Sequence, residues 1–390
     1  MASPAALESP DFRLSFPPLS VVKELVILRG CFRVFLFYDV ADAIDLARLR
    51  ELLGSGATPA QPAFPRRTPE YIRFEQAPIV EPIEPVVLAT GEQLTCSIKY
   101  YSYAVAAVQL EAPFECDWDA LLRQASRWMD TAELEPRLRD LLGRHLQPLA
   151  GAVNITRPSQ NWLQDAYLVV DLQEIRQPGG GETTATELLS AHGERIVRLI
   201  RGEFAPLSPR SVEEALQASI SYYASDLVVV GATAALVYDR PEDAAATIQI
   251  LEYARTQLLE FRYYDNLMTR VLANVYLALD RKRNILLSRR RLSGDANRLN
   301  TIRLDVMELT ERIDNAIKFL SDVFYARVYH LAAGRMGVPD YRDLVEEKLR
   351  TARELYDFMV DQFNEARAFV IEAAIALLCL LDVILLLRGK

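Results

Sequence analysis

The sequence predicts an α+β fold: a mixed N-terminal α/β domain, then a long antiparallel coiled helical hairpin, then a C-terminal apolar helix. Before Asp239, short β-branched and aromatic runs are separated by proline and glycine, as in strands joined by turns. After Asp239, apolar residues recur three or four apart with few breakers, which is the period of a helix. We therefore divide the chain into a flexible N-terminus (1–19), a mixed α+β domain (20–238), a long helical coiled-coil region (239–367) and a C-terminal transmembrane or buried apolar helix (368–390).

Composition narrows the class of protein. At 390 residues, with 51% hydrophobic and 25% charged residues, the chain can form a sizeable core but is too polar for a multi-span membrane protein. A net charge of −9 disfavours a general affinity for nucleic acid. The four cysteines form no CxxC pair, which disfavours a disulfide framework or a zinc site and favours a reducing compartment. The first residues resemble neither a secretory signal nor a transit peptide.

Within the mixed domain, strands and helices alternate irregularly. Two helical stretches lie between Trp118 and His145, and a short helix ends at Gly54. The triple-glycine run in "QPGGGETT" lacks the spacing of a phosphate-binding loop, and we expect Thr183 or Thr184 to cap the helix that follows. Strands are predicted at "VVKELVILRG", "FRVFLFYDV", "PIEPVVLA", "LTCSIKYYSYAVAAVQLE", "AYLVVDLQEI" and, as two strands or one bent segment, "ISYYASDLVVVGATAALVYD".

Three long helices are predicted in the helical region. The first begins after Asp239 and continues to a break permitted by Gly294. The second is predicted from about residue 297 to 333 and ends at Gly334 and Gly337. The third starts at Pro339 and meets no strong breaker before the terminal apolar stretch. Helices of this length are typical of an extended coiled bundle.

The terminal stretch 368–387 is apolar except for Glu372 and Asp382. Twenty helical residues rise about 30 Å, enough to cross a hydrocarbon core. We predict a single-pass membrane anchor, in which Arg388 and Lys390 meet the interface. The two acids either contact a neighbouring helix of a homo-oligomer, or Glu372 lies at the interface and Asp382 is tolerated within the span. The alternative is a helix buried all round by protein within a homo-oligomer. Either way, most of the chain would lie in the cytoplasm or an equivalent reducing compartment.

A basic run lies at the predicted turn between the first two long helices. It suits an anionic surface: we favour membrane lipid head groups over RNA, while a solvated hairpin tip is the simplest interpretation. The residues predicted to contact that surface are Arg281, Lys282, Arg283, Arg289, Arg290, Arg291 and Arg298.

The C-terminal stretch resembles a known family. In "KLRTARELYDFMVDQFNEARAFVIEAAIALLCLLDVILLL", Tyr356, Asn364, Arg367, Glu372 and Asp382 match the pattern of the family named "required for meiotic nuclear division". "FLFYDVADAIDLARLRELLG" is similar to the family's opening strand and helix. In the C-terminal stretch, Ala373 follows the first acid, where that family usually has an aromatic residue. The resemblance implies a membrane-anchored, oligomeric protein with a mixed domain. Mitochondrial members are linked to organellar translation.

The predicted function is that of a membrane-anchored, self-associating scaffold. We predict no enzymatic activity, cofactor or metal, because G-x-S-x-G motifs are absent and the three histidines are too far apart in sequence for a zinc-ligand motif. The predicted partners are a second copy of the chain and lipid head groups, with nucleic acid disfavoured except at the basic tip. The alternatives are a soluble homo-oligomeric helical scaffold, an RNA- or ribosome-associated factor and, as a third class, an enzyme whose site in the N-terminal domain has no recognisable motif.

Overall fold

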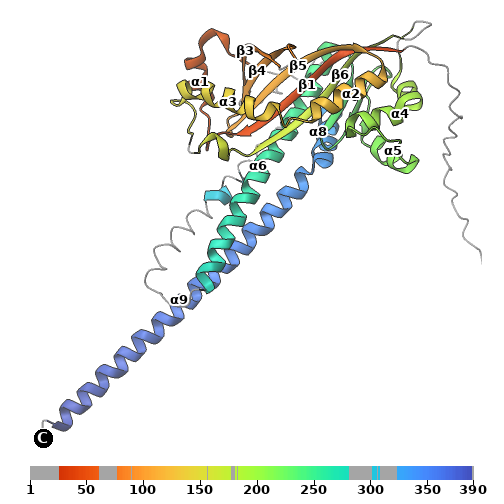
Figure 1. Cartoon of the computed structure of the whole chain (residues 1–390). Helices are drawn as coiled ribbons and strands as arrows, with labels where there is room; N and C mark the ends of the chain where they lie inside the picture. The colour runs from red at the N-terminus through yellow and green to blue at the C-terminus, as the bar shows by residue number, and fades with distance from the viewer. Residues whose placement is uncertain are drawn as a thin grey trace, which may run out of the picture.

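The computed structural model describes residues 26–60, 77–88, 90–155, 157–176, 181, 183–280, 301–304, 306–307 and 323–388. These residues form a body around one mixed sheet, from which a helical arm projects (Figure 1). The predicted α+β fold class is confirmed: the strands precede the long helices in sequence, and the helices cover both faces of the sheet.

The sheet has the strand order β2-β3-β4-β5-β1-β6-β9-β8-β7. At its centre, β1 pairs antiparallel with β5 and β6, while β6 and β9 are parallel. Two strands were predicted where β1 is continuous; a register shift at Arg29/Gly30 lets it pass through the glycine without ending. The strands are β1 (Ile27–Asp39), β2 (Thr58–Pro59), β3 (Ile79–Val87), β4 (Gln93–Tyr100), β5 (Val105–Cys116), β6 (Gln164–Arg176), β7 (Ser219–Ile220), β8 (Leu227–Val230) and β9 (Ala234–Tyr238).

The helices of the body begin at polar caps. Asp45 and Asp117 accept hydrogen bonds from backbone N–H groups of α1 and α2. Thr184 forms a capping box with Glu187, which confirms the cap predicted after the triple glycine. The helices of the body are α1 (Leu46–Leu53), α2 (Trp118–Met129), α3 (Leu134–Leu146), α4 (Ala185–Arg201) and α5 (Pro209–Leu216).

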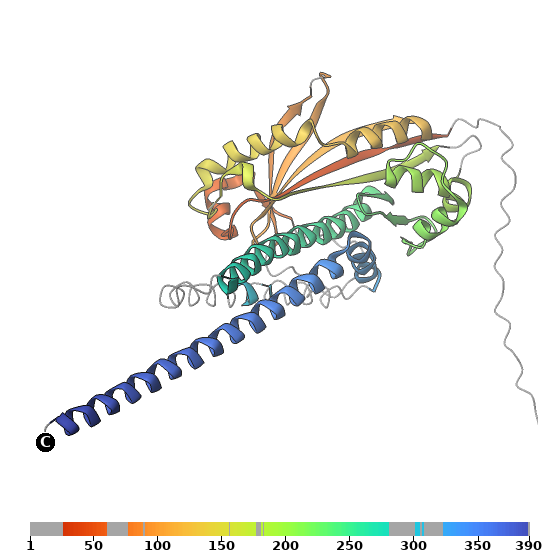
Figure 2. The same cartoon turned by 60° about the horizontal axis from the view of Figure 1, so that its bottom comes forward.

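Each face of the sheet packs against its own hydrophobic core, because successive side chains of β1 point to opposite faces. Phe32, Val34 and Leu36 point to the face covered by α2, α3 and α4. Phe35 and Phe37 point to the opposite face, which packs against α6 (Pro241–Asp280), α8 (Val323–Met336) and α9 (Val338–Arg388). Figure 2 shows the resulting layers: body helices, sheet, α6, and then α8 and α9.

The arm consists of α6 and α9, which lead away from the sheet side by side and in the same direction (Figures 1 and 2). Lys348 of α9 lies 2.5 Å from Asp265 of α6, and Val345 and Ala352 are fully buried. The returning helix predicted at 297–333 lies partly outside the described residues, which include helical turns at 301–304 and 306–307 and then α8. Of the two glycines predicted to end this helix, Gly334 lies within α8, whereas Gly337 is confirmed as the break, because its φ of 86° separates α8 from α9.

The predicted membrane anchor is wrong. Among the helices described here, none is both long enough and apolar enough to cross a bilayer. Residues 368–387 are not a separate span but the far part of α9, a single helix of 51 residues that starts against α8 and packs on α6. The assignments of transmembrane helix, tail anchor and single-pass membrane location are therefore corrected.

Candidate functional site

Of the residues predicted to contact a membrane or another subunit, Glu372 alone has a described side chain, and it is exposed on α9. Asp382 and Arg388 belong to α9 by their backbone, and Lys390 lies outside the described residues. The predicted anionic-surface residues also lie outside the described ranges: Arg281, Lys282, Arg283, Arg289, Arg290, Arg291 and Arg298.

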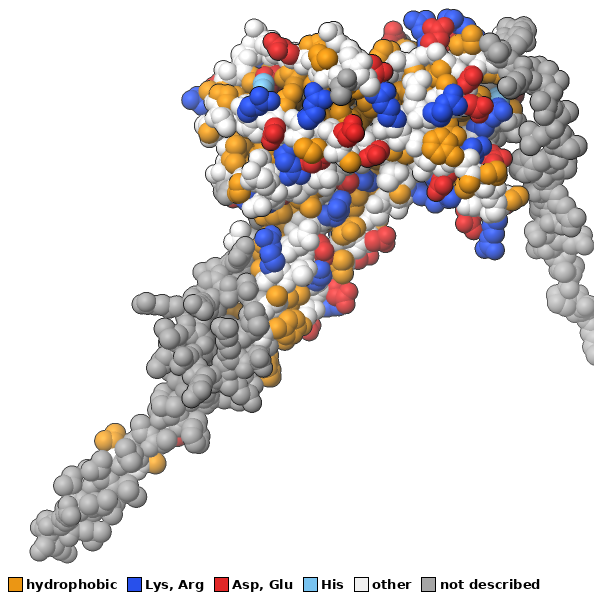
Figure 3. All heavy atoms as spheres, viewed as in Figure 1, with side chains coloured by type: hydrophobic (Ala, Val, Ile, Leu, Met, Phe, Trp, Pro, Cys, Tyr) orange, Lys and Arg blue, Asp and Glu red, His pale blue; other side chains and the backbone are white. Residues whose placement is uncertain are grey.

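The far part of α9 presents apolar side chains to solvent. Ile375 is 55% exposed and Leu378 is 63% exposed, and Cys379 is exposed beside them. Closer to the body, Phe358 and Tyr276 are also more than half exposed. In Figures 1 and 2, α9 continues well beyond the end of α6, and Figure 3 shows apolar side chains along the described part of the arm. This surface lies where sequence analysis placed the site, but it is a surface of a projecting helix.

The arm is fixed to the body by buried polar contacts as well as by the core. On α6, Arg255 donates a 2.7 Å hydrogen bond to Asp165 at the start of β6. Thr256 Oγ1 lies 2.7 Å from the hydroxyl of Tyr103, and Gln257 accepts a hydrogen bond from Tyr329 of α8. Buried polar contacts of this kind have fixed partners, so they set how α6 lies on the sheet.

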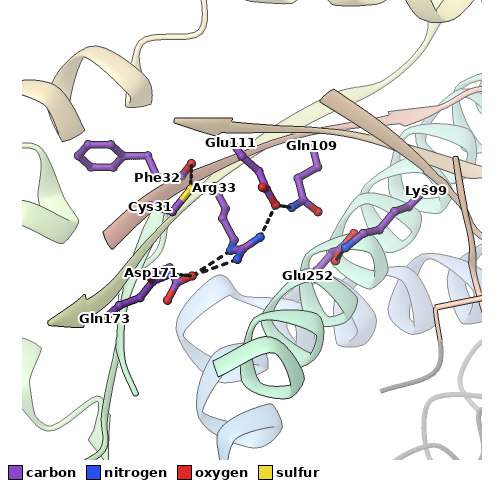
Figure 4. Close-up of polar contacts among 9 residues, drawn as sticks. All are labelled: Cys31, Phe32, Arg33, Lys99, Gln109, Glu111, Asp171, Gln173 and Glu252. Carbon is purple, nitrogen blue, oxygen red and sulfur yellow. Dashed lines mark hydrogen bonds and ion pairs between the residues drawn. The ribbon is translucent and has the colours of Figure 1, made fainter. Parts of the chain in front are cut away.

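A second candidate site, which sequence analysis missed, lies on the sheet itself. It is a hollow of about 530 Å³ over β5 and β1, reaching Gln173 of β6. Arg33 points to the same face of β1 as Phe35 and Phe37, but it lies nearer the start of the strand, where polar side chains replace the apolar core. Figure 4 shows Arg33 between Glu111 of β5 and Asp171 of β6.

Arg33 organises this hollow. Its Nη1 donates to Glu111 Oε1, while its Nε and Nη2 donate to Asp171 Oδ2 at 3.2 and 3.1 Å. Gln109 donates to Glu111 Oε1 at 2.8 Å, and Gln173 donates to Asp171 Oδ2 at 3.2 Å. Three strands thus supply one hydrogen-bonded cluster, which we call the Arg33 cluster.

The electrostatics of the Arg33 cluster suit binding better than nucleophilic catalysis. Burial raises the pKa of Asp171, although Arg33 opposes that effect. Burial also raises the pKa of the Cys31 thiol to about 11, so Cys31 is a protonated thiol at neutral pH and a poor nucleophile. Within the described ranges, no three His, Cys, Asp or Glu side chains form a group that could hold a metal ion.

One sequence signal could have indicated the hollow. The side chains of β1 that share one face change from Phe37 and Phe35 to Arg33 and Cys31, so the apolar alternation stops halfway along a strand of 13 residues. The partners Glu111 and Asp171 stand 78 and 138 residues away in sequence, and only the strand register brings them to Arg33.

Comparison with known proteins concerns the body. A family model described as "Uncharacterized protein MJ0711, N-terminal domain" matches residues 29–244, from β1 to the first turn of α6. The uncharacterized protein MJ0711 of Methanocaldococcus jannaschii is 22% identical over 192 residues, which are 49% of this chain and 58% of that protein. The chain therefore matches little more than half the length of this relative. No solved structure matches the chain.

These matches overturn the resemblance drawn from the C-terminal stretch. The matched region contains the sheet and the Arg33 cluster but ends in the first turn of α6, well before α9, where Tyr356, Asn364 and Arg367 suggested the meiotic nuclear division family. A pattern of a few residues within an apolar helix is weak evidence, since many unrelated helices share it. The chain belongs to the family defined by the N-terminal domain of the uncharacterized protein MJ0711.

Proposed function

We propose that this protein is a self-associating scaffold, in which the far part of α9 binds a second copy of the chain. The observation that carries this proposal is the exposure of Ile375 and Leu378, at 55% and 63%, on a helix that extends past α6. Soluble chains seldom leave neighbouring large apolar side chains uncovered unless they bind something. A scaffold needs no catalytic group, and the protonated Cys31 thiol and the ion-paired carboxylates of the Arg33 cluster are compatible with that role.

The sequence of the tail supports a second copy as the partner. Residues 368–387 are apolar except for Glu372 and Asp382, so most of the helix circumference lacks charge. A helix gains most of its stability from packing an apolar face, and the same helix already packs on α6 nearer the body. Every copy presents the same tail, and closed assemblies of identical subunits are the commonest kind of oligomer.

Light scattering of the purified full-length chain, resolved by size exclusion from 1 to 100 µM, tests the proposal. We expect a mass of at least two chains. The double variant Ile375→Glu/Leu378→Glu should shift the mass to one chain, because each carboxylate would have to be desolvated in the interface. Phe204→Glu is the matched control, since Phe204 is 54% exposed but lies in the body; it should leave the mass unchanged.

Two outcomes would contradict the proposal. The full-length chain could remain a monomer at 100 µM, or the tail variant could retain the oligomeric mass of the native chain. Circular dichroism of the variant distinguishes loss of association from loss of folding, because the body contributes its own helices and sheet.

A further inference from the structure

The arm contains a short helical segment that packs on the core through one side only. Its described residues, 301–304 and 306–307, belong to the part of the chain that connects α6 with α8. Ile302 and Val306, four residues apart, are buried in the core that α6, α8 and α9 share. The short cyan segment in Figure 1 accordingly lies beside α6.

The opposite side of this segment combines a cation with two apolar side chains. Leu304 and Met307, three residues apart, are each more than half exposed. Arg303 is also exposed and stands four residues before Met307, so the two share a side of the helix. We call these three residues the arm patch. Neighbouring large apolar side chains seldom stay uncovered unless they bind something, so the arm patch is a contact surface.

The tail of α9 presents the same pattern with the opposite charge. Ile375 and Leu378 are also three residues apart, and the exposed Glu372 stands three residues before Ile375. We call these three residues the tail patch. In both patches the charged residue stands on the N-terminal side of the apolar pair, and it is an arginine in one and a glutamate in the other. The two patches are therefore complementary in charge and in apolar spacing.

The two patches of one copy cannot meet. The arm patch lies beside α6, whereas α9 is a single helix that carries the tail patch past the end of α6 (Figures 1 and 2). To reach its own arm patch, the tail would have to fold back and break the helix. The tail patch can therefore contact the arm patch of a second copy only.

The direction of the chain fixes how two copies would pair. Both α6 and α9 run away from the sheet, and α8 lies against it (Figures 1 and 2). Chain order places the segment with the arm patch on the path from the far end of α6 back to α8, so this segment runs toward the sheet. In two arms that lie antiparallel, the partner's α9 runs in that same direction. The apolar pairs then meet, and the arginine of the arm patch lies next to the glutamate of the tail patch.

We infer that the tail patch of each copy docks on the arm patch of the other, in a two-fold pair of antiparallel arms. This inference rests on the proposed self-association and adds its docking site and its direction. A two-fold axis makes the same contact twice, so both tails are covered at once. Parallel arms would instead bring Glu372 of one tail beside Glu372 of the other, and like charges oppose association.

Disulfide crosslinking of full-length chains tests the contact, because Cys379 directly follows Leu378, which faces Met307 in this arrangement. Met307→Cys/Cys379→Ser is mixed with the native chain, and copper phenanthroline in air oxidises thiols that lie close together, with oxygen as the electron acceptor. We expect covalent dimers in which peptide mass spectrometry finds position 307 joined to Cys379. Phe204→Cys/Cys379→Ser is the matched control, since Phe204 is exposed on the body, and it should give no dimers joined through position 204.

The outcomes separate this inference from the proposed function. Dimers joined only through Cys379 to Cys379 would show parallel arms, which would overturn the antiparallel docking and leave self-association intact. A chain that light scattering finds monomeric would overturn both.

Exchanging the two charges provides a second test. Arg303→Glu and Glu372→Arg should each weaken association by about tenfold or more, because each places like charges together twice in the dimer. Arg303→Glu/Glu372→Arg should restore the dissociation constant to within about threefold of the native value, which a merely misfolded variant would not do. Arg210→Glu, at an exposed arginine on α5, is the control and should leave association unchanged. Failure of the double variant to recover would overturn the docking of tail patch on arm patch.

Discussion

Lys99 of β4 and Glu252 of α6 form an ion pair at 2.5 Å that joins the sheet to the arm (Figure 4). The two residues are 153 apart in sequence, and their side chains are 15% and 0% exposed. A buried pair of this kind fixes how two elements meet, because either charge left alone would be strongly unfavourable.

Removing one partner should therefore destabilise the protein. We expect Lys99→Met to lower the free energy of unfolding by about 3 kcal/mol, since it leaves Glu252 buried without its cation. The double variant Lys99→Met/Glu252→Met should recover most of that loss. Urea unfolding measures both, with Arg48→Met in the exposed Arg48–Glu51 pair as a control expected to cost less than about 0.5 kcal/mol. Equal effects of Lys99→Met and Arg48→Met would refute the role given to the buried pair.

The Asp39–Arg157 pair predicts a dependence of stability on pH. Arg157 binds both carboxylate oxygens of Asp39, at 2.8 and 3.0 Å, yet burial raises the pKa of Asp39 to about 6. The unfolded value is about 3.9, so the folded state binds more protons in between, and the contribution of Asp39 to stability falls as pH rises from about 4 to 6. In Asp39→Asn this decline should disappear. Urea unfolding of the native chain and of Asp39→Asn at pH 4, 5, 6 and 7 measures this. The difference between their free energies of unfolding should change with pH; a constant difference would exclude the raised pKa of Asp39.

Gly30 is expected to tolerate no side chain. The Cβ of Gly30→Ala would overlap the Asp171 carbonyl, so we expect a loss of at least about 3 kcal/mol or failure to fold. Gly334 is the matched control: it lies in α8 with open space around it, and Gly334→Ala should stabilise the protein by about 0.5–1 kcal/mol. Thermal unfolding compares the two, and a Gly30→Ala protein as stable as the native chain would show that β1 and β6 need no such approach.

The four cysteines should differ sharply in reactivity. Burial raises the pKa of Cys31 and Cys116 to about 11 and that of Cys96 to about 12, so little thiolate forms at these positions at pH 8. Cys379 is exposed on the tail. An aromatic disulfide reagent should therefore show one fast-reacting thiol, which Cys379→Ser removes. If copies associate through the tail, that fast rate should fall as protein concentration rises; a rate independent of concentration would argue against association there.

The extent to which sequence predicted this structure varied with the range of the interactions involved. The cap at Thr184 and the break at Gly337 depend on a few neighbouring residues, and local chemistry was enough to predict both. The Arg33 cluster could not be predicted, because its partners stand on separate strands whose register is set by the whole sheet. The terminal apolar stretch was misassigned because hydropathy measures only how unfavourable it is to expose a segment to water. It does not say whether the segment is buried in lipid or packs against protein.

The continuity of α9 has a mechanical consequence. A helix of 51 residues rises about 76 Å, and its direction is set at one end by the turn at Gly337 and along its first half by α6. A rotation of about five degrees at that turn would carry the far end through about 7 Å, while the sheet stayed in place. A small change in packing at the Lys348–Asp265 contact would therefore move the C-terminal end of α9 by several times as much.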